Sequence, residues 1–210
     1  MKKLLLASLL AMPVASFAAD NQSAYVGVEL GYTRIDNVAQ QTANYLVGSV
    51  GGSAIVTADS GMALGKIFAG YKFNENLSAE IGAFRTSDFD MNAAGVSGGS
   101  VAYTAKSTTN VYGFEGSLLV RPSESSGLNG LFGRIGAHWD KAESEVSAVG
   151  AGSSATGNSY NSGTGFLVGA GYDVNFDKSL TGRINYTYYD GVAGTDSYAN
   201  VGSLALMYKF

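Results

Sequence analysis

The stretch NVGSLALMYKF, residues 200–210, decides the fold class of this chain. One set of alternate positions holds Gly202, Leu204, Leu206, Tyr208 and Phe210, and the other holds Val201, Ser203, Ala205, Met207 and Lys209. Successive side chains of a β-strand point to opposite faces, so the stretch predicts a strand with one apolar face and one smaller, more polar face. Such a strand suits a wall with lipid on one side and a filled interior on the other.

The same alternation recurs along the chain and predicts an all-β protein. We expect eight strands, at residues 24–35, 61–73, 77–88, 107–121, 128–140, 163–175, 179–190 and 200–210. Pro122 ends the fourth strand because proline lacks the amide hydrogen that a β-ladder requires. The fold that fits eight strands of this kind is an antiparallel up-and-down transmembrane β-barrel.

The connections between these strands differ in length in an alternating way. Residues 74–76, 122–127 and 176–178 form short turns, whereas 36–60, 87–106 and 141–162 are long. Short turns on one rim and long connections on the other are typical of outer-membrane barrels. The long connections are rich in Gly, Ser, Ala and Asn with scattered acids, which predicts mobile loops.

The N-terminus carries a targeting signal. Lys2 and Lys3 precede the apolar run 4–14, and Ser16 to Ala18 supply the small residues that a signal peptidase needs. We therefore expect a secretory signal peptide at 1–18 and a barrel domain at 19–210. No other run of about 18 apolar residues follows, so no helical membrane span is expected.

The composition agrees with a membrane barrel rather than a soluble fold. Charged residues make up 14% of the chain, against about 25% in a typical soluble domain. The chain has 29 Gly, 13 Tyr and 10 Phe but two Pro, which fits aromatic girdles and a crowded interior. It has no Cys, so disulfides cannot hold the fold. The net charge of −4, near −6 without the signal lysines, argues against a nucleic-acid surface.

Six charged residues fall on inward-facing positions of the expected strands. They are Glu29, Lys66, Glu80, Glu115, Arg134 and Arg183. An eight-stranded barrel is narrow enough for side chains to fill it, and charges buried there must pair because an unpaired buried ion costs several kcal/mol. This network either holds the interior together or forms a rearrangeable plug that admits water and small ions.

The residues give little support for catalysis or metal binding. His138 is the only histidine, faces inward, and has Asp140 as the nearest acid on its face. No nucleophile lies beside it in the sequence, so a hydrolase is not indicated. The chain has no Cys/His cluster, so a zinc site is not indicated either. Asp88 and Asp90 lack the rest of a calcium loop. We predict that the protein is not an enzyme and uses no cofactor.

Several blocks of the chain together resemble the transmembrane domain of OmpA-type outer-membrane proteins. They are VELGYTRID, FAGYKFNENLSAEIGAF, LFGRIGAHW, GAGYDVNFDKSLTGRINYTYY and the final YKF. The resemblance implies a Gram-negative outer-membrane location, and it implies that Phe210 is part of the signal read by the barrel-assembly machinery. Implied partners are outer-membrane lipid or lipopolysaccharide, that machinery, periplasmic chaperones, and a host or surface ligand of the loops, but no nucleic acid.

The family's interior salt-bridge cluster matches this chain only in part. Glu80, Arg134 and Arg183 match its pattern. Gly171 stands where the family has a glutamate, and an apolar residue near Leu118 stands where it has a lysine. We expect Glu115 to compensate for the missing glutamate. No peptidoglycan-binding domain is expected after Phe210. The resemblance implies a structural, envelope-integrity and adhesin-like role, with a narrow low-conductance porin gated by the lumen salt bridges as the alternative.

Overall fold

The computed structural model describes residues 23–34, 43–44, 47–48, 51–123, 127–150 and 153–210. The expected signal peptide 1–18 lies outside these residues. Within them, no helix has the length and apolar character to cross a bilayer.

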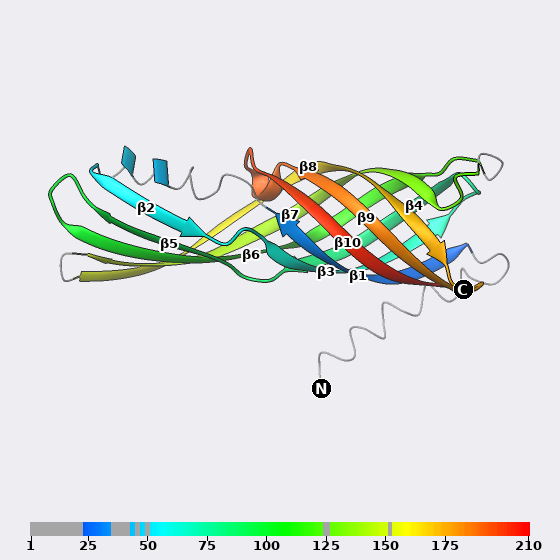
Figure 1. Cartoon of the computed structure of the whole chain (residues 1–210), viewed down its shortest axis with the longest axis horizontal. Helices are drawn as coiled ribbons and strands as arrows, with labels where there is room; N and C mark the ends of the chain where they lie inside the picture. The colour runs from blue at the N-terminus through cyan, green and yellow to red at the C-terminus, as the bar shows by residue number, and fades with distance from the viewer. Residues whose placement is uncertain (1–22, 35–42, 45–46, 49–50, 124–126, 151–152) are drawn as a thin grey trace, which may run out of the picture.

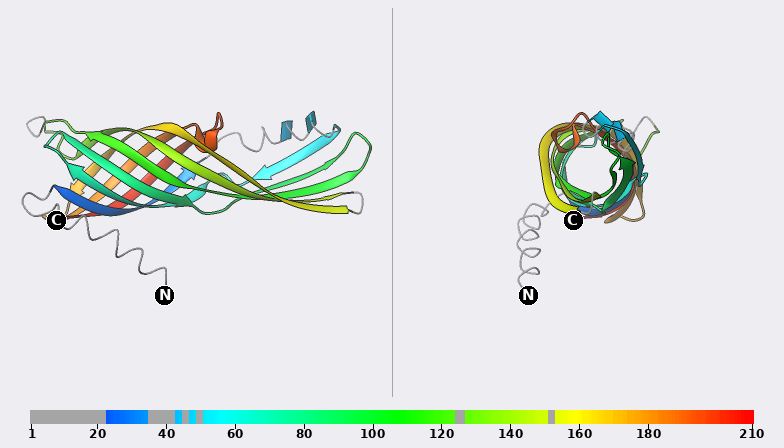
Figure 2. Two further views of the ribbon diagram at one scale, coloured as in Figure 1. Left: turned by 180° about the vertical axis from the view of Figure 1, so that it is seen from behind. Right: turned by 90° about the vertical axis from the view of Figure 1, so that its left-hand side faces the viewer.

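Ten strands form one antiparallel sheet. They are β1 (Ala24–Arg34), β2 (Ser53–Ala58), β3 (Met62–Lys72), β4 (Leu77–Thr86), β5 (Phe89–Val96), β6 (Ala102–Val120), β7 (Leu131–Gly150), β8 (Ser153–Asn175), β9 (Leu180–Asp190) and β10 (Tyr198–Lys209), with a short 3₁₀ turn, η2 (Val192–Gly194), before β10. Eight of them close into a barrel in the order β1-β3-β4-β6-β7-β8-β9-β10, and β10 pairs back onto β1. The predicted eight-stranded barrel is confirmed, and Figure 2 shows the closed ring in its end-on view.

The terminal strand closes the barrel in the register that its alternation requires. Opposite Leu204 on β10 stands Leu30 on β1, and opposite Tyr208 stands Val26. All four side chains face away from the lumen. The backbone N–H of Phe210 donates to the carbonyl oxygen of Ala24 at 3.1 Å, so the last residue fastens the seam between the first and last strands.

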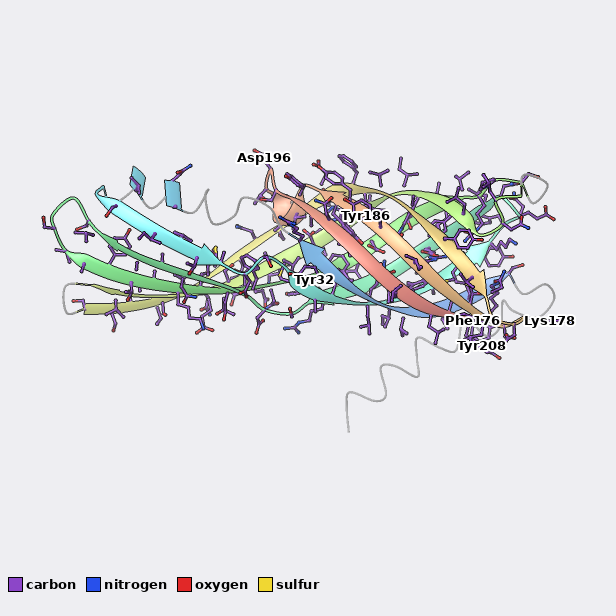
Figure 3. The ribbon with its side chains drawn as sticks, viewed as in Figure 1. Tyr32, Phe176, Lys178, Tyr186, Asp196 and Tyr208 are labelled. Carbon is purple, nitrogen blue, oxygen red and sulfur yellow. The ribbon has the colours of Figure 1, made fainter. Side chains whose placement is uncertain are left out.

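The outer face of the barrel is apolar between two aromatic belts. Figure 3 shows Tyr32 and Tyr186 in the half of the closed barrel nearer the projecting strands, and Phe176 and Tyr208 at the opposite end, near the C-terminus. Between these belts the outward side chains are large aliphatic residues such as Leu30, Ile67, Ile81, Ile135, Ile184 and Leu204, all highly exposed. An apolar band flanked by aromatic residues is the surface that a bilayer covers, so the predicted lipid-facing positions are confirmed.

In the described residues of the three long connections, the prediction of mobile loops is wrong over most of their length; residues 36–42, 45–46, 49–50 and 151–152 of these connections lie outside the described part. β2 and β5 lie within them, and β6, β7 and β8 run to 19, 20 and 23 residues, about twice the 9–11 needed to cross a bilayer. The polar composition hid the strands because Ser and Thr alternating with Val and Ala pair well in a ladder that solvent covers on both faces.

These extra strands form a projecting sheet, which consists of β2, β5 and residues 102–110, 141–150 and 153–162 of β6, β7 and β8. It leaves the barrel at the end opposite the C-terminus (Figure 1). About ten residues at 3.3 Å each carry it roughly 30 Å beyond the barrel. The short turns therefore mark one rim and the projecting sheet marks the other.

Candidate functional site in the barrel lumen

All six predicted lumen charges are buried inside the barrel, and the structure divides them between two networks. The lower ion network lies toward the C-terminal rim and contains Glu80 and Arg183. The upper ion network lies nearer the middle and contains Glu29, Lys66, Glu115 and Arg134. All six residues face the lumen, and they form two separate networks rather than one continuous cluster.

The lower ion network is built around the guanidinium of Arg183. Its Nη1 donates to Glu80 Oε1 and its Nε to Asp173 Oδ1, each at 2.7 Å. Arg121 Nη2 donates to the other oxygen of Asp173 at 2.9 Å, and the Tyr25 hydroxyl donates to Glu80 at 2.8 Å. The Arg183 guanidinium also lies 4.5 Å from the centre of the Phe132 ring. Arg183 is therefore fixed by two carboxylates and an aromatic face.

The upper ion network is built around Lys66 and Glu115. Lys66 Nζ lies 2.8 Å from Glu29 Oε2 and 3.0 Å from Glu115 Oε1, and Arg134 pairs with the same oxygen of Glu115. The Tyr189 hydroxyl donates to Glu115 Oε2 at 2.6 Å. Ser117 and Ser203 complete the network with hydrogen bonds to Arg134 and Glu29, at 2.9 and 2.8 Å.

Each network is electrically balanced. The lower one joins two carboxylates, on Glu80 and Asp173, to two guanidinium groups. The upper one joins two carboxylates to one ammonium and one guanidinium. Because each of these charges is paired with an opposite one, the desolvation cost of burying it is partly offset.

Above the ion networks, the outer part of the lumen is apolar. Its core joins Leu64, Phe84, Val111, Leu167, Tyr189, Ala199 and Val201, with Ala142 and Val192 packed against it. A cavity of about 30 Å³ remains there, with room for one or two water molecules. The Thr33 hydroxyl lines this cavity and has no hydrogen-bond partner within the part of the chain that the structure describes.

His138 closes this apolar layer at the outer rim with Asp140. Its Nε2 donates to the carbonyl oxygen of Asp190 at 2.9 Å, and its Nδ1 lies 3.1 Å from Asp140 Oδ2. The other oxygen of Asp140 accepts from the backbone N–H of Ala193 at 2.7 Å, which draws η2 over the lumen. Both ring nitrogens face acceptors that position a loop, so the geometry is that of an interior fastening rather than of a general base beside a nucleophile.

Sequence reasoning missed two charged members of the lower ion network, Asp173 and Arg121. Asp173 sits on the inward parity between Tyr172 and Val174, and Arg121 follows the outward Val120, so strand alternation was a sufficient signal for both. Asp140 was noted as a neighbour of His138, but its hold on Ala193 depends on a loop that folds inward, which alternation does not encode.

The projecting sheet carries its charges differently, on a solvated surface. Asp90 accepts from the Thr108 hydroxyl at 2.7 Å and lies 3.3 Å from Lys106 Nζ. The hydrogen bond from Thr108, and then that from Lys106, lower the pKa of Asp90 below its usual value. These contacts are exposed to solvent, so they add little to the stability of the sheet.

Comparison with known proteins places the chain in a family. The model of the outer membrane protein beta-barrel domain matches residues 4–210. A comparison with curated proteins finds no match.

The chain is similar to several solved structures at low sequence identity. The attachment invasion locus protein Ail of Yersinia pestis is 17% identical, with 90% of this chain and 99% of that chain covered and a TM-score of 0.45. OprG of Pseudomonas aeruginosa is 11% identical, with 91% and 99% covered and a TM-score of 0.43. The N-terminal barrel domain of OprF from the same organism is 13% identical, with 89% and 97% covered and a TM-score of 0.39.

The closed barrel, its apolar band and the match over nearly the whole chain agree, and the chain belongs to the outer-membrane β-barrel family and is located in the outer membrane.

Proposed function

We propose that this protein is a structural component of the outer membrane that presents its projecting sheet as a surface for interaction outside the cell. The observation that carries the proposal is the contrast between a lumen that holds buried, paired charges and an apolar cluster, and a polar sheet that extends far beyond the bilayer. A barrel with these two features has its accessible chemistry outside the membrane rather than within a channel.

The contents of the lumen support a structural role for the six predicted charges. Each network is neutral and hydrogen-bonded, and the apolar layer above them leaves space for one or two waters. An ion crossing this barrel would have to break paired charges and then pass an apolar layer, and both steps are costly in a low-dielectric interior.

The composition of the projecting sheet supports the interaction role. The β8 segment 153–162 is exposed throughout and carries Ser, Thr, Asn and Tyr side chains without a charge. Rigid strands present such side chains in a fixed arrangement, which reduces the ordering cost of binding relative to a mobile loop. We therefore assign to the projecting sheet the adhesin-like role that the sequence suggested for mobile loops.

The test compares cells that display the full chain with cells that display a trimmed variant. Ser144 pairs directly with Ser159, so replacing residues 145–158 by Asn-Gly joins them through a two-residue hairpin turn without changing the barrel register. We expect the trimmed protein to reach the surface at equal level and to lose retention on surfaces coated with extracellular matrix.

Two measurements serve as controls, one of barrel folding and one of envelope integrity. Slow gel migration before boiling verifies that the trimmed barrel is folded, and dye entry reports envelope integrity. Equal retention of both strains would refute the interaction role. Loss of envelope integrity on deleting the whole chain, with integrity kept by the trimmed variant, would assign the structural role to the barrel alone.

One observation favours a narrow pore as the second candidate. Lys66 lies between two carboxylates at nearly equal distances, so a small shift would exchange one pairing for the other. We would record ionic current across a planar bilayer that contains the folded barrel. Discrete steps that change in Arg183→Ala support a gated channel, and a silent membrane leaves the networks as interior packing.

A further inference from the structure

The outer wall of the barrel has a groove on its lipid-facing side, on β1, β3 and β4. Its volume is about 440 Å³, and its outward-facing lining residues are Val28, Leu30, Gly65, Ile67, Ala83 and Arg85. They form two cross-strand rows, Leu30–Gly65–Arg85 and Val28–Ile67–Ala83. The missing side chain of Gly65, between Leu30 and Arg85, makes the floor of the groove.

Gly65 is not required by the packing of the barrel. A Cβ added there would approach only the carbonyl oxygen of Arg85, at 4.0 Å. By contrast, a Cβ on the inward-facing Gly171 would lie 2.4 Å from the Phe132 ring. The space over Gly65 is therefore open, and on a hydrocarbon-facing wall it is filled by acyl chain.

Arg85 supplies a charge at the outer end of this groove. On the same cross-strand row it stands opposite Tyr112, which stands opposite Lys141. Tyr112 and Lys141 come one outward position beyond Phe114 and Trp139, whose rings stack with centroids 6.3 Å apart in the outer aromatic belt. Arg85 is thus at headgroup depth, on the side of the membrane from which the projecting sheet emerges.

The guanidinium of Arg85 acts electrostatically on Glu143, but that carboxylate is already paired with Lys141. Lys141 Nζ lies 3.0 Å from Glu143, which also accepts from the Tyr112 hydroxyl at 2.9 Å. Within the part of the chain that the structure describes, no hydrogen bond or ion pair engages the exposed Arg85 guanidinium. Arg85 and Lys141 are about 10 Å apart along the row, because two inter-strand spacings of about 4.8 Å separate them.

We propose that this groove is a binding site for a phosphorylated glycolipid of the outer leaflet. The first methylene groups of one acyl chain lie over Gly65, between Leu30 and Ile67, and a headgroup phosphate accepts hydrogen bonds from Arg85. A guanidinium matches phosphate oxygens in a bidentate geometry, whereas Lys141 is already paired with Glu143 and is left out of the site. The site is on the barrel wall, so it is independent of the proposed role of the projecting sheet.

The test uses native mass spectrometry of the folded barrel in detergent with bisphosphorylated lipid A as the probe. We expect Arg85→Gln to weaken retention of lipid A about tenfold, because a charge-assisted hydrogen bond to phosphate is lost. Gly65→Leu fills the groove without a clash and is expected to weaken retention by a similar factor. Gel mobility before boiling verifies folding of each variant.

Matched controls separate this site from general charge and surface effects. Lys106→Gln removes a cation that is already paired with Asp90, and Gly133→Leu adds the same side chain at an open outward position on β7. We expect both to retain lipid A as the unmodified protein does. Equal loss in the controls, equal binding of dephosphorylated lipid A or of phosphatidylglycerol, or an unchanged Gly65→Leu variant would overturn the proposal.

Discussion

The two halves of β7 pair with the same two neighbouring strands, but their side chains differ in burial. In 131–140, inward and outward residues alternate between buried and exposed, with Phe132 at 1% and Asp140 at 2% exposure. In 141–150, no residue is buried, although each still pairs with β6 and β8. Hydrogen bonding thus extends the sheet beyond the bilayer, whereas the buried residues of β7 are confined to its half in the closed barrel.

This contrast predicts that stability is concentrated in the closed part of the chain. Below the outer rim, a substitution on the inward face removes a buried partner or leaves a cavity. Above the rim, the same type of substitution changes a solvated surface. Matched pairs of variants, one in each half, therefore test the comparison directly.

The largest effect is expected from Arg183→Ala in the lower ion network. The substitution leaves Glu80 and Asp173 buried with a missing counter-charge, and we expect the free energy of unfolding to fall by about 3–5 kcal/mol. Urea titration of the barrel in detergent micelles, followed by Trp139 fluorescence, measures it. Lys106→Ala, at an exposed pair of the projecting sheet, should leave the midpoint unchanged; equal shifts in the two variants would break the comparison.

A smaller effect is expected in the apolar layer. Leu167 is fully buried there, so Leu167→Ala should destabilise the barrel by about 2–5 kcal/mol through lost packing and a cavity. Val149→Ala, on the projecting sheet, should change stability by less than about 0.5 kcal/mol. The same titration compares them. A Leu167→Ala barrel as stable as the unmodified one would show that the outer lumen is not packed as described.

A local effect is expected at the fastening of η2. Asp140→Ala removes the acceptor of the Ala193 N–H, a charged hydrogen bond worth about 1.5–3 kcal/mol. We expect hydrogen exchange at the Ala193 amide to accelerate by at least tenfold. Asp196→Asn, in the same connection, serves as the control. Unchanged exchange at Ala193 would mean that the turn is held by its other contacts.

The smallest effect is a pKa change on the projecting sheet. The hydrogen bond from Thr108 lowers the pKa of Asp90, so this contact favours the folded sheet above the unfolded pKa and is lost as pH falls through the folded one. Thr108→Val should raise the pKa of Asp90 toward its usual value, and so should Lys106→Gln. Carboxyl carbon chemical shifts during a pH titration measure both. An unchanged pKa of Asp90 in Thr108→Val would show that this hydrogen bond does not lower it.

Strand alternation was a strong predictor of the barrel and a partial predictor of its lumen. It placed all six expected charges inside, because one parity of every wall strand faces the interior. It was applied incompletely at Arg121 and Asp173, which obey the same rule. It failed in the long connections, where a low apolar content was taken as the absence of strands, although a ladder exposed on both faces needs no apolar face.

The sequence did not indicate which of the charged residues pair with one another. Glu80 and Arg183 are 103 residues apart, and only the closure of the ring and its register bring β4 and β9 to face each other across the lumen. The same holds for the inward turn that brings Ala193 to Asp140, and for the row that places Arg85 beside Tyr112.

By itself, the sequence determined the all-β class, the number of wall strands and the face of each residue, because period two is a local property of the extended backbone. Only the tertiary structure decided the division into two neutral networks, the reach of the projecting sheet and the groove over Gly65. These depend on the register between strands far apart in the chain, which is fixed by the hydrogen bonds of the whole closed ring.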